Sequence, residues 1–312
     1  MQITKAAQML GHKGSVYTLE QGSTPHLFYS GGSDGLIVEW DLQNPDNGRL
    51  IANVPGVIYS IKKLGTRYLL VGTDKGGIHI IDLTTNAEIK YLLNHTNGVF
   101  DILVLPTQNK FVALGGDGSF SVWDSTDFSC LTTIKLCDAK LRSAEVIASP
   151  PGPLSQREGE QSPLIVIACG DNTIRIIETD TYTETARVEN HSSAVYAVTM
   201  HPNGKYLLSG SRDAHLNVYD VANAYTLLHS IPAHNFAIYS IVFSPNGKLF
   251  ATASRDKTLK IWDSETFTVL QRISLDSHQG HKNSVNKLLW TSYNNLLIST
   301  GDDRAVLAWQ AN

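Results

Sequence analysis

Cysteine is scarce in this chain of 312 residues. The three cysteines, Cys130, Cys137 and Cys169, are odd in number and form no CxxC pair. A disulfide framework is therefore excluded as the basis of the fold. We predict that all three are buried, reduced thiols of a cytoplasmic protein.

Long apolar runs and an excess of positive charge are also missing. No apolar run approaches the ~18 residues that a membrane-spanning helix needs, and the first ten residues, MQITKAAQML, lack the apolar segment of a secretory signal. The formal net charge is −4, whereas nucleic-acid-binding domains more often carry a strongly basic surface. We therefore expect a cytoplasmic protein with neither a membrane nor a nucleic acid as its partner.

What the chain does contain is an internal repeat. The segment 233–264 has three strand-like apolar runs separated by polar turns, one of which contains Pro245 and Gly247. The segment 190–221 repeats this pattern, so that Asp213 and Asp256 lie 43 residues apart. A repeat of this length, made of short strands and ending in Trp-Asp, is typical of propeller blades.

Seven such repeats can be aligned on the turn before the last strand of each. The aligned turn residues are Asp34, Lys75, Asp117, Asp171, Asp213, Asp256 and Asp303. The position six residues later holds Trp40, Ile81, Trp123, Ile177, Tyr219, Trp262 and Trp309. Five of these seven residues are aromatic, which chance would not place so regularly.

On these residues the chain resembles the WD-repeat family over nearly its whole length. The resemblance implies an all-β fold, a seven-bladed propeller of four-stranded antiparallel blades, as a single domain over residues 1–312. It also implies that the strand-like segment 2–9 completes the last blade, which would close the ring and leave no open sheet edge there. The stretch 149–163, rich in Pro, Gly and Ser, is expected to be a disordered insertion in the first hairpin of blade four.

The resemblance further implies a hydrogen-bonded set of His, Ser or Thr, Asp and Trp inside a blade. The sets are His12, Ser30, Asp34 and Trp40; His234, Thr252, Asp256 and Trp262; His281, Ser299, Asp303 and Trp309; and His191, Ser209 and Asp213 with Tyr219 in the Trp place. They contain the residue types of a catalytic triad, but a set repeated in several blades is better explained as structural. We expect no catalytic residue, no metal and no cofactor.

Three blades depart from this pattern. Blade three keeps His95, Asp117 and Trp123 but has Ala113 where the hydroxyl is expected. Blades two and four have no turn histidine and end in Ile-Asp and Ile-Glu. We expect these two blades to be held by apolar packing alone.

One position looks functional: the residue at the start of each first strand, five after the turn histidine where there is one. It is Tyr17, Tyr59, Phe100, Arg142, Tyr196, Tyr239 and Asn286. By the resemblance it surrounds the central channel on the top face, where the family commonly binds peptides. Tyr and Arg are the residue types that dominate interface hot spots.

A second set of positions, directly before each turn residue, contributes charge. Arg212 and Arg255, together with Lys140 and Arg142, predict a positive arc over blades four to six, opposite Asp74 and Asp302. Such a face would orient a peptide with its acidic part toward Arg212 and Arg255.

We therefore predict a non-enzymatic scaffold that recognises a protein or peptide on its top face, as a monomeric propeller within a larger complex. Tyr196, Tyr239, Arg212 and Arg255 are the first candidates for contact. Two alternatives stay open. One is a sensor of a small anionic or phosphorylated ligand that binds Arg142, Arg212 and Arg255; the other is an enzyme that uses the central channel.

Overall fold

The protein is described by a computed structural model that covers residues 2–148 and 162–311. In these residues, 28 strands form seven four-stranded antiparallel sheets. Blade one comprises β2 (Val16–Gln21), β3 (Leu27–Gly32), β4 (Leu36–Asp41) and β5 (Arg49–Asn53). Blade two comprises β6 (Ile58–Leu64), β7 (Tyr68–Thr73), β8 (Gly77–Asp82) and β9 (Ala87–Leu93). Blade three comprises β10 (Val99–Leu105), β11 (Lys110–Gly115), β12 (Ser119–Asp124) and β13 (Cys130–Lys135).

The other four blades follow in chain order. Blade four comprises β14 (Leu141–Ile147), β15 (Leu164–Cys169), β16 (Ile174–Glu178) and β17 (Glu184–Val188). Blade five comprises β18 (Val195–Met200), β19 (Tyr206–Ser211), β20 (His215–Asp220) and β21 (Thr226–Pro232). Blade six comprises β22 (Ile238–Phe243), β23 (Leu249–Ser254), β24 (Leu259–Asp263) and β25 (Val269–Ile273). Blade seven comprises β26 (Val285–Trp290), β27 (Leu296–Gly301), β28 (Ala305–Ala311) and β1 (Ile3–Leu10).

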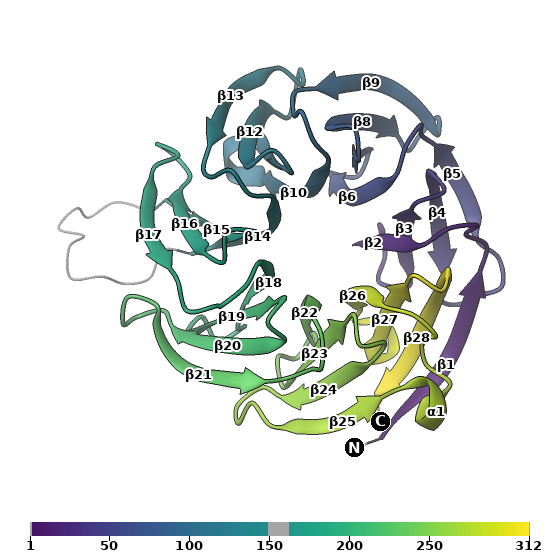
Figure 1. Ribbon diagram of the computed structural model, residues 1–312. Helices are drawn as coiled ribbons and strands as arrows, with labels where there is room; N and C mark the ends of the chain where they lie inside the picture. The colour runs from purple at the N-terminus through teal and green to yellow at the C-terminus, as the bar shows by residue number, and fades with distance from the viewer. Residues whose placement is uncertain (1, 149–161, 312) are drawn as a thin grey trace.

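The sheets are arranged in a ring, with the first strand of each blade nearest the centre (Figure 1). The predicted seven-bladed propeller is confirmed, and so is its closure. The N-terminal β1 pairs antiparallel with β28, with Ile3 opposite Ala311 and Leu10 opposite Ala305. Short helical turns occur at η1 (Pro106–Gln108), η2 (Tyr293–Asn295) and α1 (Leu275–His278). No helix among the described residues is long and apolar enough to span a membrane.

The core is divided among the contacts between neighbouring blades. Second and third strands are almost wholly buried, and every residue of β8 is buried. Outer strands such as β9 are mostly exposed. One cluster joins Leu208 and Leu216 of blade five to Phe250 and Trp262 of blade six. This burial drives the packing of blade against blade, because each sheet alone would leave its apolar faces in water.

The turn between the second and third strands of every blade contains one residue with positive φ. These residues are Gly35, Gly76, Gly118, Asn172, Ala214, Lys257 and Arg304. At Gly118 (φ 78°) a Cβ would also overlap the carbonyl oxygen of Cys137, so this position needs glycine for space as well as for conformation.

Each innermost strand has a β-bulge near its start, and the bulge determines where one side chain points. In β2 the register shifts between Val16 and Thr18, so that Tyr17 has no partner in β3. The same shift skips Tyr59, Phe100, Arg142, Tyr196, Tyr239 and Asn286 in the other six blades. A bulge redirects the unpaired residue. These seven are the residues that the sequence predicts at the mouth of the channel.

The predicted insertion at residues 149–163 lies outside the described residues except for Ser162 and Pro163. The described strands on either side, β14 and β15, are paired as the first hairpin of blade four.

Candidate functional site

In three blades the set of His, hydroxyl, Asp and Trp forms one continuous chain of hydrogen bonds. In blade one the indole Nε1 of Trp40 donates to Ser30 Oγ (2.8 Å), which lies 2.7 Å from His12 Nε2. His12 Nδ1 lies 3.0 Å from an Asp34 carboxylate oxygen. The same chain links His234, Thr252, Asp256 and Trp262 in blade six and His281, Ser299, Asp303 and Trp309 in blade seven. Every polar group has a partner, so the chain stabilises the blade and leaves no free nucleophile.

Burial and hydrogen bonding determine the charges in these sets. Burial lowers the pKa of His12 and of His234, because it disfavours the imidazolium, and the neighbouring aspartate offsets this only in part. Burial alone would raise the pKa of Asp213 and of Asp256, but hydrogen bonds from the histidine side chain and from backbone N–H groups hold it well below its ordinary value. At neutral pH His12 and His234 are therefore neutral, and Asp213 and Asp256 are ionised.

Blade five substitutes a phenol for the indole. Ser209 Oγ lies 2.7 Å from His191 Nε2 and 3.4 Å from the hydroxyl of Tyr219. That hydroxyl also accepts a hydrogen bond from Asn217 Nδ2 at 3.0 Å. The tyrosine oxygen, unlike an indole N–H, accepts as well as donates, so blade five needs the extra donor that Asn217 supplies.

Blade three has a complete set, contrary to the expectation that its hydroxyl is missing. Ser121 supplies the hydroxyl: it accepts from Trp123 Nε1 at 2.7 Å and lies 2.9 Å from His95 Nε2. Ser121 stands directly opposite Ala113 in the pairing of β11 with β12. The hydroxyl has therefore moved to the neighbouring strand while its place between the two rings is kept.

The expectation that blades two and four rest on apolar packing alone is wrong. In blade four the buried guanidinium of Arg175 donates to Asp171 (2.6 Å), to Glu184 (3.1 Å) and to the carbonyl of Leu136 (2.7 Å). In blade two the buried carboxylate of Asp82 accepts from Arg67 at 2.9 Å. The position of the turn histidine in the repeat does not reveal these networks, because arginine side chains are the hydrogen-bond donors in them.

The cysteines differ in burial, so the expectation of three buried thiols is wrong. Cys169 is buried, Cys137 half-buried and Cys130 exposed, and all three are free. The two thiols of Cys137 and Cys169 and a carboxylate oxygen of Asp171 lie within 4.8 Å of one another, a grouping that could hold a metal ion. The Asp171 oxygens already accept from Thr173 and Arg175. A cation there would have to displace the guanidinium, so we assign no metal.

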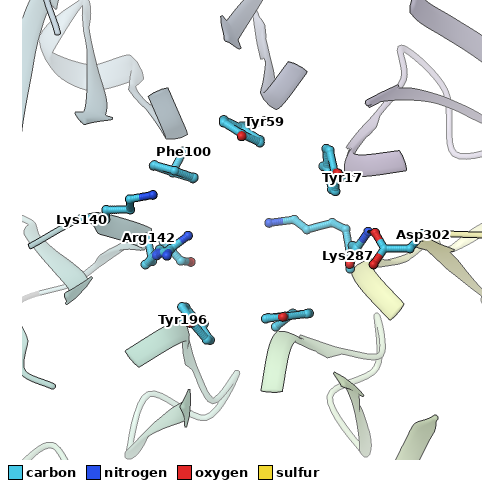
Figure 2. Close-up of a pocket in the computed structure, with 11 residues that line it drawn as sticks. Tyr17, Tyr59, Phe100, Lys140, Arg142, Tyr196, Lys287 and Asp302 are labelled. Atoms are coloured by element: carbon cyan, nitrogen blue, oxygen red, sulfur yellow. Dashed lines mark hydrogen bonds between the residues drawn. The ribbon is translucent and has the colours of Figure 1, made fainter. Parts of the chain in front are cut away.

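The structure brings the seven bulge residues together around one pocket at the mouth of the channel, on the face where the innermost strands begin, which we call the top face (Figure 2). The cavity has a volume of about 430 Å³. Its lining consists of Tyr17, Tyr59, Phe100, Lys140, Arg142, Ser143, Tyr196, Tyr239, Asn286, Lys287 and Asp302. We call this cavity the top pocket. Its volume lies in the range of ligand sites.

Neighbouring ring positions touch one another around most of the top pocket. The rings of Tyr59 and Phe100 stack with centroids 4.8 Å apart. Arg142 lies between Phe100 and Tyr196, with its Cζ 4.7 Å and 4.8 Å from the two ring centroids. Asn286 closes the circle, because its Nδ2 donates to the carbonyl of Val16 in blade one at 3.0 Å. These contacts restrict the side chains that surround the top pocket.

Arg212 and Arg255, which the sequence places in the binding arc, do not line the top pocket. Both are exposed, and the Arg255 guanidinium lies over the ring of Phe236 at 5.9 Å. Sequence reasoning missed Lys287, whose side chain points toward the middle of the top pocket (Figure 2). The bulge at Asn286 brings two consecutive residues to the channel side, which simple alternation along a strand does not predict.

Three acidic side chains in and below the top pocket accept hydrogen bonds from neighbouring groups. Asp302, which the sequence places on the top face opposite the positive arc, lines the mouth and accepts from Asn286 at 2.9 Å. Deeper in the channel, Glu145 accepts from the backbone N–H of Met200 at 3.1 Å, and burial raises its pKa. Asp101 accepts from the N–H of Ala144 at 3.0 Å.

Comparison with known proteins finds one matching family. The family model described as "WD domain, G-beta repeat" matches residues 4–41, 182–220, 225–263 and 272–310. These segments end in the third strands of blades one, five, six and seven. They are the blades whose hydroxyl stands at the usual place in the second strand.

Relatives and solved structures agree with this match. Human echinoderm microtubule-associated protein-like 3 is 27% identical over 70% of this chain and 23% of its own length. Mouse striatin-4 is 23% identical over 68% of this chain and 29% of its own length. The chain thus spans about a quarter of the length of these curated relatives. The WD40 propeller of Doa1 superimposes with a TM-score of 0.81 over 99% of this chain and 97% of that one, at 18% identity, which shows the fold alone.

Proposed function

The chain belongs to the WD40 repeat family, and from that premise we propose that it is a non-enzymatic scaffold that recognises a protein or peptide through the top pocket. The single observation that carries the proposal is the ring of seven bulge residues. All seven line one cavity, and five of them are aromatic. Aromatic side chains bring large contact area with few rotatable bonds, which suits an interface centre.

The rigidity of the top pocket supports this role. Each ring residue is anchored on a strand, and Arg142 and the aromatic rings on either side of it are in mutual contact. A partner that binds such a pre-formed surface loses little further side-chain entropy on its side of the interface. Binding of this kind needs no proton transfer or nucleophile.

The distribution of potential catalytic groups also favours binding over catalysis. The histidines with aspartate partners are spread over separate blades, and each is bonded to a hydroxyl that another side chain also uses. General acid–base catalysis needs a titratable group within reach of bound substrate. We also propose a cytoplasmic location, which the three free thiols support.

The test is affinity capture from native extract with matched tyrosine variants. Tyr17→Ala/Tyr196→Ala removes two pocket rings, whereas Tyr91→Ala removes a tyrosine from the outer strand β9. We expect a protein that is captured by the wild type and by Tyr91→Ala, and lost from the double variant at an unchanged melting temperature. Equal capture by all three proteins would refute the proposal.

A further inference from the structure

Arg142 is a partly buried cation that has no counter-ion among the described residues. Its Nε is buried and has no hydrogen-bond partner, and the side chain forms no ion pair with any described residue. The guanidinium instead lies between the rings of Phe100 and Tyr196. Burying an uncompensated charge is unfavourable. By contrast, the buried Arg175 of the same blade is paired with two carboxylates.

Two further cations face the same cavity. Lys140 lies over the ring of Phe100 with its Nζ 5.3 Å from the centroid, and Lys287 points toward the middle of the top pocket from the opposite side to Arg142 (Figure 2). The single acid of the lining, Asp302, is held by Asn286. This local positive excess stands out in a chain whose net charge is −4.

The tyrosines add neutral donors around these cations. Among the described residues, no hydrogen bond involves the hydroxyls of Tyr17, Tyr59, Tyr196 or Tyr239, all of which line the top pocket. An O–H donor and a guanidinium fork together match an anion with several acceptor oxygens. The lining thus offers donors in excess and few acceptors.

We propose that the top pocket binds an oxyanion carried by a peptide, either an acidic side chain or a phosphorylated residue, with Arg142 as its anchor and Lys140 and Lys287 alongside. This inference rests on the proposed function and specifies the partner's chemistry. It places the anion inside the ring, in contact with Arg142, and not over the exposed Arg212 and Arg255. A cavity of about 430 Å³ accommodates one such side chain together with flanking backbone.

The experiment measures binding of fluorescein-labelled short peptide pools to the full chain by fluorescence anisotropy. The pools are identical except for a fixed central residue, which is Glu, phosphoserine, Gln or Lys. The proteins are wild type, Arg142→Gln, Arg142→Lys and Lys248→Gln, a charge-matched control at the exposed turn between β22 and β23. Inorganic phosphate and acetate serve as competitors.

We expect the Glu or the phosphoserine pool to bind wild type at least about ten-fold more tightly than the Gln pool. Arg142→Gln should abolish this preference, Arg142→Lys should keep part of it because it keeps the charge without the fork, and Lys248→Gln should keep all of it. The stronger of the two acidic pools identifies the source of the anion. The preference should weaken as salt is raised.

Other outcomes overturn the inference in distinguishable ways. Equal binding of the Gln, Lys and acidic pools, or no binding of either acidic pool, contradicts the proposal that the top pocket binds an anion. If protein capture still depends on Tyr17 and Tyr196, the proposed function survives this result. Binding of inorganic phosphate without either acidic pool would make the occupant a free anion and exclude the peptide. An acidic preference that survives Arg142→Gln would remove Arg142 as the anchor.

Discussion

The Arg142 guanidinium lies with its Cζ 4.7 Å from the centroid of the Phe100 ring, and it forms no ion pair with an acidic group in the described part of the chain. The position of Arg142 has two opposing effects on the stability of the fold. A cation–π contact contributes about 0.5–2 kcal/mol, whereas desolvation of the charge is unfavourable. We therefore expect Arg142 to contribute little net stability, as the proposed role in anion binding requires.

This balance predicts that Arg142→Gln changes the melting temperature by no more than about 4 °C, the shift that corresponds to roughly 1 kcal/mol in a large domain. Arg175→Gln should be more harmful, by about 1.5–3 kcal/mol, because the buried guanidinium makes charge-assisted hydrogen bonds to Asp171 and Glu184 and also donates to the carbonyl of Leu136. Differential scanning calorimetry of both variants tests the contrast. A large loss of stability in Arg142→Gln would mean that the residue is structural.

Ser121 gives a test of the displaced hydroxyl in blade three. Ser121→Ala should lower the free energy of unfolding by about 2–4 kcal/mol, because the buried groups of His95 and Trp123 lose their shared partner. Ala113→Ser in the same chain should recover part of that loss, since Ala113 lies opposite Ser121 in the sheet. Denaturant unfolding measures both. No effect of Ser121→Ala would contradict the bonded set.

Stability should fall as the solution is acidified. The pKa values of His12 and His234 are lowered in the folded state, so the unfolded chain binds more protons and stability is lost as pH falls through the unfolded value of about 6.5. The lowered pKa values of Asp213 and Asp256 act in the same direction below the unfolded value of about 3.9. Melting temperatures measured from neutral to acid pH check this sign. A rise on acidification would contradict it.

Two glycines with positive φ allow the conformational cost of adding a Cβ to be measured separately from the steric cost. The positive φ of Gly118 (78°) and of Gly204 (72°) disfavours any residue with a Cβ. At Gly118 a Cβ would also clash with a backbone carbonyl, whereas no atom lies within 4 Å of a Cβ built at Gly204. We expect Gly204→Ala to cost about 1 kcal/mol and Gly118→Ala to cost clearly more. Equal losses in the free energy of unfolding, measured with denaturant, would show that the backbone at Cys137 shifts at little cost to accommodate the Cβ.

The fold could be predicted from the sequence because its signals are local and repeated. Turn residues, Trp-Asp endings and apolar runs recur at nearly constant spacing, and each blade needs only its neighbours for burial. The spacing also showed that Tyr17, Tyr59 and Phe100 occupy equivalent positions, and the family resemblance implied that these positions surround the channel.

The rest depended on register and on interactions across strands, which spacing does not show. Ser121 replaces the hydroxyl from the opposite strand, and Lys287 reaches the top pocket because a bulge disturbs the alternation before it. Arg212 and Arg255 satisfied the spacing but lie on exposed turns. The spacing along the sequence identifies which residues occupy equivalent positions in the blades. The β-bulges determine which of these side chains point into the same pocket.

Site-specific photo-crosslinking tests most directly whether the top pocket holds the partner. A benzophenone amino acid would be placed at Tyr239 in the top pocket and, separately, at Tyr91 on the outer strand β9, with irradiation in native extract. We predict a discrete crosslinked protein from position 239 that is absent from position 91. Crosslinks from position 91 alone, or the same products from both positions, would contradict recognition through the top pocket.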